Sequence, residues 1–91
     1  MPSARYEIIF TGRVQGVFFR ATAQKIANQF TITGWVRNEP DGSVRCLAEG
    51  EPTDLDQFVI AIQKAKQSNI KDTKIIKLEA TDEFNGFTVR S

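Results

Sequence analysis

Histidine is absent from this chain of 91 residues, and cysteine, tryptophan, tyrosine and methionine each occur only once. The lack of histidine removes the side chain that most often serves as a general base near neutral pH. The single cysteine, Cys46, excludes an internal disulfide, and the chain lacks the several ligands that a zinc finger requires. Any catalysis by this chain must therefore proceed without imidazole chemistry.

Long apolar runs and an excess of one charge are also missing. The first residues contain no signal peptide pattern, and no segment is apolar for long enough to span a membrane. Twelve basic and 11 acidic residues leave a net charge of +1, whereas dedicated nucleic-acid-binding proteins normally carry a large basic excess. We expect a cytoplasmic protein that binds neither nucleic acid nor membrane, and whose anionic ligands are small.

What is present is an ordinary globular composition, with 41% apolar and 25% charged residues. A chain of this length has room for one core, so we expect a single domain over residues 1–91. Such a domain buries about 60–65% of its unfolded surface and can fold alone. A monomer suits the small size and the absence of a coiled-coil pattern.

Strands are predicted where apolar and β-branched residues alternate or cluster. The first strand should bury Tyr6, Ile8 and Phe10 on one face. Pro40-Asp41-Gly42 predicts a hairpin turn, because proline presets φ and glycine permits a positive φ. Glu39 and Asp41 are interpreted as residues of that turn. The predicted strands cover residues 5–11, 31–37, 43–49, 74–80 and 86–90.

Helices are predicted where apolar residues recur at i, i+3, i+4 and i+7. Thr53 and Asp56 resemble a capping box at the start of the second helix, which should end near Lys66. Two helices with one apolar stripe each can cover only one face of a sheet. We therefore expect a two-layer α+β sandwich of the ferredoxin-like kind, β-α-β-β-α-β with a short extra C-terminal strand, on an antiparallel sheet. The stripes consist of Ala23, Ile26, Ala27 and Phe30, and of Leu55, Phe58, Val59 and Ile62.

The run from Gly12 to Arg20 joins the first strand to the first helix, and its composition suits a small anion. Backbone N–H groups and the positive end of the helix dipole converge at such a junction, and the Arg20 guanidinium adds forked donors. The alternative is that the glycines only let the chain turn and that Arg20 is a solvated surface residue. No Gly-Lys-Ser/Thr follows, so a nucleoside triphosphate site is not expected.

A second motif, Gly34-Trp35-Val36-Arg37-Asn38, is followed by Asp41-Gly42-Ser43-Val44 and then by Gly50. Together with the first run it resembles the acylphosphatase family, whose patterns are Gly-x-Val-Gln-Gly-Val-x-Phe-Arg and Gly-aromatic-Val-basic-Asn with later glycines. The resemblance covers the whole chain. The chain differs from the family outside the motifs. It has no Gly-Pro at residues 67–71, where members often have one, and it has Arg45 where many members have an acidic residue.

This resemblance implies an enzyme that hydrolyses acyl phosphates to a carboxylate and inorganic phosphate, with no metal or cofactor. Carried over by position, Arg20 binds the phosphate and Asn38 positions the attacking water. The resemblance also implies that backbone amides of the loop bind the phosphate, namely those of Gln15, Gly16, Val17, Phe18 and Phe19.

The chemistry is consistent with these residues. A carboxylate leaving group has a conjugate acid with a pKa of about 4, so no general acid is needed to expel it. Phosphoryl transfer depends mainly on positioning and charge stabilisation. The alternatives are a non-hydrolytic binding or accessory module with the same fold and an RNA-binding sheet, although residues 43–49 contain no aromatic residue. A chain of this length, from a methionine to a closing strand, favours the free-standing enzyme.

Other residues are interpreted more simply. Cys46 is expected to be a core thiol rather than a nucleophile. Phe18 and Phe19 should anchor the loop in the core rather than stack on a ligand. Arg13 is expected to be solvated. Trp35 either lines the site or covers a sheet edge, and the sequence leaves both interpretations open.

Overall fold

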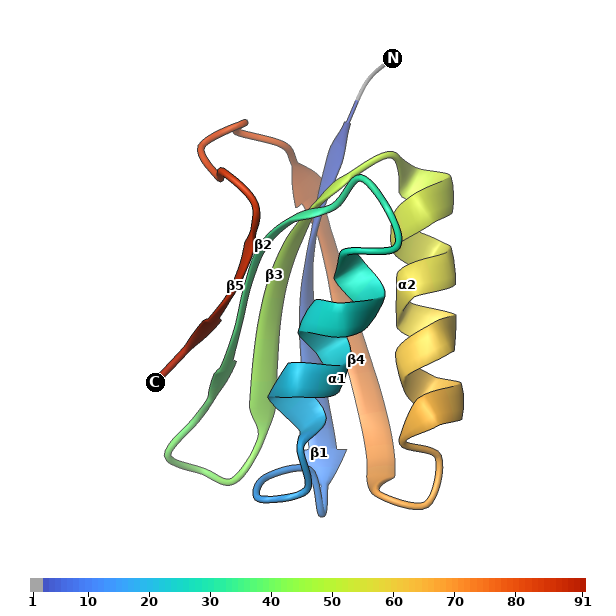
Figure 1. The fold of residues 1–91 in the computed structure, drawn as a ribbon, viewed down its shortest axis with the longest axis vertical. Coiled ribbons are helices and arrows are strands. Elements are labelled where there is room, and N and C mark those ends of the chain that lie inside the picture. The colour runs from blue at the N-terminus through green and yellow to red at the C-terminus, as the bar shows by residue number, and fades with distance from the viewer. Residues whose placement is uncertain (1–2) are drawn as a thin grey trace.

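The computed structural model describes residues 3–91, which form a five-stranded sheet and two helices (Figure 1). The strand order is β4-β1-β3-β2-β5. The predicted ferredoxin-like order of elements, with its extra closing strand, is confirmed. The elements are β1 (Ala4–Gly12), α1 (Phe19–Ala27), β2 (Thr33–Asn38), β3 (Val44–Gly50), α2 (Pro52–Ala65), β4 (Ile70–Glu79) and β5 (Phe87–Arg90).

The sheet is mixed, not wholly antiparallel as predicted. The pairs β1–β3, β1–β4 and β2–β3 are antiparallel, whereas β5 runs parallel to β2, with Gly34 opposite Phe87 and Arg37 opposite Arg90. The direction of β5 follows from topology. Strands β1 and β2 both run opposite to β3 and so share one direction, whereas β4 runs opposite to β1. The chain leaves β4 at one end of the sheet, crosses to the far edge through residues 80–86 and returns in the direction of β2 (Figure 1).

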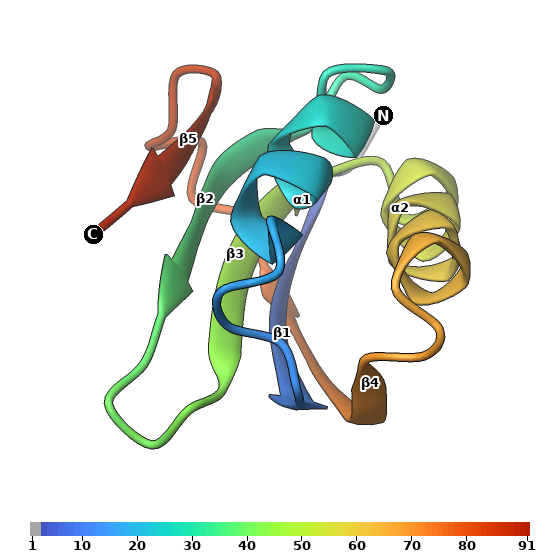
Figure 2. The same ribbon diagram turned by 60° about the horizontal axis from the view of Figure 1, so that its bottom comes forward.

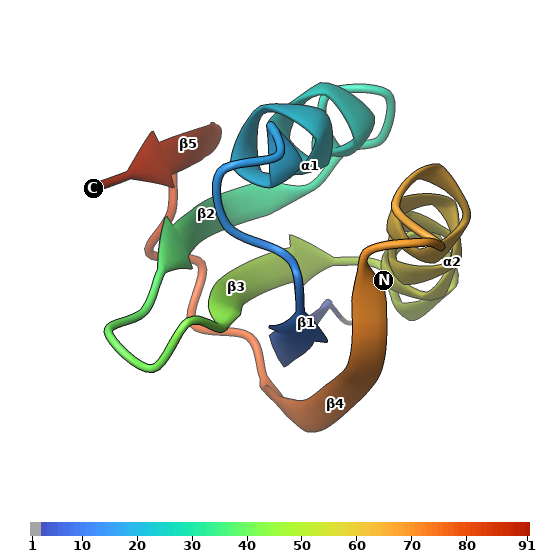
Figure 3. The same ribbon diagram turned by 90° about the horizontal axis from the view of Figure 1, so that it is seen from below.

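The core lies between the sheet and the two helices, which cover the same face (Figure 3). The predicted inner face of β1 is buried, and so are the expected helical stripes except Phe30. The prediction that Phe30 belongs to the first helix is wrong, because α1 ends at Ala27, and Phe30 packs partly buried against the core from the turn that follows. Cys46 is wholly buried from solvent, which confirms its assignment as a core thiol, and this burial raises the pKa of the thiol well above its usual value. Helix α1 packs nearest to β2 and β5, and α2 packs nearest to β3.

The start of α2 differs from the prediction. The N-cap is Glu51, Pro52 occupies the beginning of the helix, and no side chain in the described part of the chain caps the free N–H groups. The capping box of Thr53 and Asp56 is therefore wrong. Proline presets the helical φ at this position and has no N–H to satisfy, so the helix begins earlier than the predicted box. Within residues 3–91 no helix combines the length and the apolar character needed to cross a membrane.

Strand β4 begins at Ile70, which pairs with Gly12, and not at residue 74 as predicted. The residues that open it, Lys71 and Asp72, are exposed and polar. Polar residues are tolerated there because β4 lies at the edge of the sheet, where charged side chains protect the open backbone from pairing. The pattern of apolar residues therefore predicted a start for this strand that is four residues too late.

The long loop from β4 to β5 is held to the sheet by Glu49, a carboxylate only 3% exposed. Glu49 Oε2 accepts hydrogen bonds from Arg5 Nε at 2.7 Å and from the Thr81 N–H at 2.9 Å, and Oε1 accepts one from the Asp82 N–H at 2.9 Å. These contacts set the path along which the chain reaches β5. The position of β5 matters because this strand borders the cleft described below.

Candidate active site

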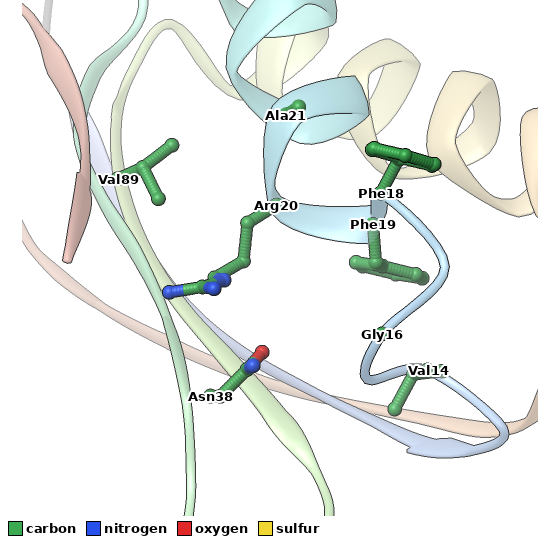
Figure 4. A pocket seen from close by; sticks show the side chains of 8 residues that line it. All are labelled: Val14, Gly16, Phe18, Phe19, Arg20, Ala21, Asn38 and Val89. Atoms are coloured by element: carbon green, nitrogen blue, oxygen red, sulfur yellow. The ribbon is translucent and has the colours of Figure 1, made fainter. Parts of the chain in front are cut away.

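A cleft of about 320 Å³ opens where the start of α1 faces the end of β2 and strand β5 (Figure 4). Arg20 and Asn38, the two predicted catalytic residues, both line this cleft although they come from different elements. The remaining lining residues are Val14, Gly16, Phe18, Phe19, Ala21 and Val89. Most of these are apolar, so the two polar side chains are the main source of directional chemistry.

Arg20 is the second residue of α1, and its side chain extends from the helix start into the cleft (Figure 4). Its Nη1 donates a hydrogen bond to the carbonyl oxygen of Arg90 in β5, at 2.7 Å. A guanidinium has five N–H donors in a fixed plane, so one bond orients the group and leaves the others for a ligand. The geometry therefore presents a positive, planar donor set at a helix N-terminus.

Asn38 is the last residue of β2, and its side chain faces the cleft from the opposite side (Figure 4). Its Oδ1 is buried and has no hydrogen-bond partner within residues 3–91. An unpaired buried acceptor costs about 1–3 kcal/mol, so native proteins rarely keep one without a role. An amide oxygen held in this way can accept a hydrogen bond from a water molecule or a protonated ligand oxygen.

The loop between β1 and α1 supplies further donors. Within residues 3–91, the N–H groups of residues 15–19 donate to no backbone carbonyl. Gly16 and Phe18 both have positive φ values, 74° and 60°. Successive backbone N–H groups in a loop with left-handed residues form concave anion-binding surfaces, and the dipole of α1 adds positive potential. The loop therefore has the free donors that an anion requires.

The side chain of Gln15 ties this loop to the β2–β3 hairpin. Its Nε2 donates to the carbonyl oxygens of Glu39 and Ser43, both at 2.8 Å. The two contacts bring the loop and the segment that follows Asn38 together. Sequence reasoning assigned only the backbone of Gln15 to the site and missed this role, because carbonyl acceptors leave no signal in a sequence.

The prediction for the two neighbouring phenylalanines is half right. Phe19 is buried and packs on Phe10, with ring centroids 5.0 Å apart. Phe18 is 83% exposed, so the prediction that it anchors the loop in the core is wrong. Phe19 lies in the first turn of α1 and faces the sheet, whereas Phe18 precedes the helix in a left-handed conformation that turns its side chain outwards (Figure 4).

Trp35 is only 6% exposed, but it does not line the cleft. Its indole ring lies beneath three guanidinium groups, those of Arg37, Arg45 and Arg90, at 4.9, 5.5 and 4.8 Å from the ring. Cation–π contacts of this kind stabilise an aromatic residue on an outer sheet face. Trp35 therefore joins β2, β3 and β5, and so supports the strand that holds Arg20.

The remaining predictions concern the loop and the hairpin. Arg13 is exposed, as expected. Glu39 and Asp41 shape the turn. The backbone carbonyl of Glu39 accepts a hydrogen bond from the Gly42 N–H at 3.1 Å, and Asp41 Oδ1 accepts one from the Ser43 hydroxyl at 2.6 Å. The hydrogen bonds from Ser43 lower the pKa of Asp41. Within the described part of the chain, no group of three or more acidic or cysteine side chains is placed to hold a metal ion.

Known proteins resemble this chain in both sequence and fold. The acylphosphatase family profile matches residues 6–89. A curated acylphosphatase from Bacillus licheniformis is 48% identical over 84 residues, covering 91% of this chain and 90% of its relative. Another, from Salinibacter ruber, is 42% identical over 81 residues, covering 88% and 85%. The crystal structure of acylphosphatase from Bacillus subtilis superposes with a TM-score of 0.90 at 35% identity, covering 97% of this chain and 99% of that one.

The family profile spans nearly all of the described residues, and the curated relatives are matched over most of their length. These findings support acyl phosphate hydrolysis as the activity of this enzyme. The chain belongs to the acylphosphatase family.

Proposed function

We propose that Arg20 and the loop amides of residues 15–19 bind the phosphoryl group of an acyl phosphate, and that Asn38 orients the water that attacks phosphorus. The observation that carries the proposal is the buried Oδ1 of Asn38, which has no partner among the described residues and belongs to the same cleft as the Arg20 guanidinium. A site with one acceptor opposite a set of donors suits a water molecule on one side and an anion on the other.

Charge complementarity supports the assignment of the donors. A phosphoryl dianion needs positive potential, which Arg20, the free N–H groups of residues 15–19 and the N-terminus of α1 supply. In a loose transition state the developing charge spreads over the phosphoryl oxygens, so preorganised donors around them lower the barrier. This arrangement requires neither a metal nor a cofactor.

The proposed step balances without an enzymic acid or base. The water oxygen forms a bond to phosphorus as the bond between phosphorus and the acyl oxygen breaks, and the leaving group departs as a carboxylate. The proton of the attacking water passes to a phosphoryl oxygen, because the Asn38 amide does not titrate. Asn38 only accepts a hydrogen bond from the water and fixes its direction of attack.

A nucleophilic mechanism through Cys46 is disfavoured by its position. The thiol is wholly buried in the core, and its burial raises its pKa, so the reactive thiolate does not form near neutral pH. Cys46 is also absent from the lining of the cleft. Direct attack by water is therefore the mechanism that the residues of the cleft support.

The test is hydrolysis of benzoyl phosphate in excess chelator by the wild type, Arg20→Ala, Arg20→Lys and Asn38→Ala. Arg20→Ala should lose roughly 10²–10³ in rate and bind inorganic phosphate weakly. Arg20→Lys should recover little, because an ammonium cannot reproduce the fork. Asn38→Ala should lower kcat while phosphate inhibition stays near the wild-type value.

Arg13→Ala is the matched control, because Arg13 is an exposed arginine at the edge of the same loop. Its activity should stay within about twofold of the wild type. Folded wild-type protein without activity would show that the anion site of Arg20 and residues 15–19 belongs to a binding or accessory module. If Asn38→Ala weakened phosphate binding as much as Arg20→Ala, the assigned division of roles would be wrong.

A further inference from the structure

Lys66, which follows the last residue of α2, makes a contact that the proposed mechanism does not use. Its Nζ donates a hydrogen bond to the carbonyl oxygen of Val17 in the anion loop, at 2.7 Å. Its backbone is held on both sides, because its N–H bonds to the Ile62 carbonyl and its own carbonyl accepts from the Asn69 N–H, each at 2.9 Å. Within residues 3–91 the ammonium has no carboxylate partner within salt-bridge distance.

This contact sets the orientation of the peptide between Val17 and Phe18. The peptide is trans, so its C=O and N–H groups point in opposite directions. Because the Val17 carbonyl points at Lys66, the Phe18 N–H points away from α2. Figure 2 shows α2 on one side of α1 and β5 on the other. Phe18 lines the same cleft as Arg20 and Val89 of β5, and the Arg90 carbonyl of β5 holds Arg20 there.

The backbone of Phe18 carries the cost of this orientation. Its φ of 60° lies in the left-handed region, which aromatic residues rarely adopt, and its side chain is 83% exposed. The left-handed backbone and the exposed aromatic ring both cost free energy, so another contact must hold the loop in this conformation. A charge-assisted hydrogen bond from Lys66 is an interaction strong enough to compensate for such a strained peptide. Strained backbone of this kind concentrates at functional sites.

We propose that Lys66 is a positioning residue of the anion site: it holds the Val17 carbonyl and so directs the Phe18 N–H at the bound phosphoryl group. The inference rests on the proposed function, in which that N–H is one of the phosphate donors. Lys66 also polarises the peptide, which strengthens the N–H as a donor. It acts through the loop and does not touch the substrate.

The test compares Lys66→Met with Lys64→Met in inorganic phosphate binding and benzoyl phosphate hydrolysis. Lys64 is an exposed lysine in the last turn of α2, so its replacement removes the same charge from the same helix end. Lys66→Met should lower kcat/KM roughly 10–100-fold, because a donor is misplaced but not removed. Lys64→Met should stay within about twofold of the wild type, and Lys66→Arg should retain most activity.

Two further measurements separate positioning from a general loss of structure. In amide NMR spectra, phosphate should shift the Phe18 N–H of the wild type, and this shift should shrink in Lys66→Met while that of Gly16 persists. Adding Phe18→Asn to Lys66→Met should restore part of the lost kcat/KM, because asparagine adopts the left-handed region more readily.

An unchanged Phe18 shift in Lys66→Met, together with activity equal to Lys64→Met, would overturn the role of Lys66. The proposed function fails in a different way. If the wild type binds phosphate but does not hydrolyse benzoyl phosphate, the hydrolytic mechanism is refuted, and the Phe18 shift still decides whether Lys66 orients the loop. If the wild type shows no phosphate-induced shift at residues 15–19, both proposals are overturned.

Discussion

Replacing Glu49 with glutamine should destabilise the protein, because both oxygens of the carboxylate accept hydrogen bonds in the folded state. Both carboxylate oxygens are acceptors: one binds Arg5 Nε and the Thr81 N–H, and the other binds the Asp82 N–H. Glutamine has only one oxygen, so its NH₂ group must face a donor at one of the two positions. The substitution preserves shape and changes only charge and hydrogen bonding.

The expected loss can be worked from these contacts. A hydrogen bond to a charged group contributes about 1.5–3 kcal/mol, and a buried donor left unpaired costs about 1–3 kcal/mol. The Arg5 guanidinium keeps its contact with Glu83, which limits the damage. We therefore expect Glu49→Gln to lower the free energy of unfolding by about 2 kcal/mol. For a domain of this size that corresponds to a fall in Tm of roughly 8–16 °C.

The effect should depend on pH with a defined sign. Burial alone would raise the pKa of Glu49, but hydrogen bonds from Thr81, Arg5 and Asp82 outweigh it and lower the pKa below its ordinary value. A lowered pKa in the folded state stabilises the protein fully above the pKa of the unfolded chain. That stabilisation disappears as the pH falls through the folded-state pKa. The gap between wild type and Glu49→Gln should therefore be widest near neutral pH.

Urea unfolding followed by the fluorescence of Trp35, the single tryptophan, measures this gap at pH 7 and at about pH 3. The matched control is Glu79→Gln, an exposed carboxylate at the end of β4, which should leave Tm within about 2 °C of the wild type. Equal stability of wild type and Glu49→Gln at pH 7 would refute the reasoning, as would a gap that widens on acidification.

Contacts at Gly34, Tyr6 and Cys46 give three further testable outcomes. Gly34→Ala should lower the free energy of unfolding in urea by about 3 kcal/mol or more, because the added Cβ would clash with the backbone oxygen of Leu47 in β3. Gly42→Ala is the control: its Cβ would meet open space, so it should cost only about 1 kcal/mol for its positive φ. Tyr6, desolvated by burial and hydrogen-bonded to Asp56, has its pKa raised to about 12, so ultraviolet titration should show ionisation well above pH 10 in the folded protein. A raised pKa in the folded state means that this stabilisation is lost as the pH rises from the unfolded-state value towards 12. Cys46 should not react with Ellman's reagent until the protein unfolds, and reaction at a rate independent of urea would contradict its burial.

Sequence patterns predicted most elements because each rests on local periodicity. The stripes of both helices and the inner face of β1 needed only the spacing of apolar residues. Boundaries were weaker where tertiary contacts decided them. Strand β4 extends back to Ile70 because β1 is there to pair with it, and β5 runs parallel to β2 because of where the chain leaves β4. Neither fact is encoded in the residues of the segment itself.

The candidate site divides in the same way. Arg20 and Asn38 were predicted from two motifs, and the structure brings them to one cleft. The side-chain role of Gln15 and the outward turn of Phe18 were not predicted. Gln15 binds carbonyl groups, and Phe18 is displaced by a backbone conformation that its residue type disfavours. Both outcomes depend on neighbours that are distant in the sequence.

The sequence by itself determined the family, the order of elements and the residue types available for chemistry, because motifs and periodicity are properties of short segments. Only the tertiary structure decided which partners these residues meet. The Arg90 carbonyl that orients Arg20, and the Val17 carbonyl that Lys66 holds, belong to the backbone. Every residue carries the same carbonyl group, so no letter marks the one that is used. Strand register and helix packing alone place it within hydrogen-bonding distance.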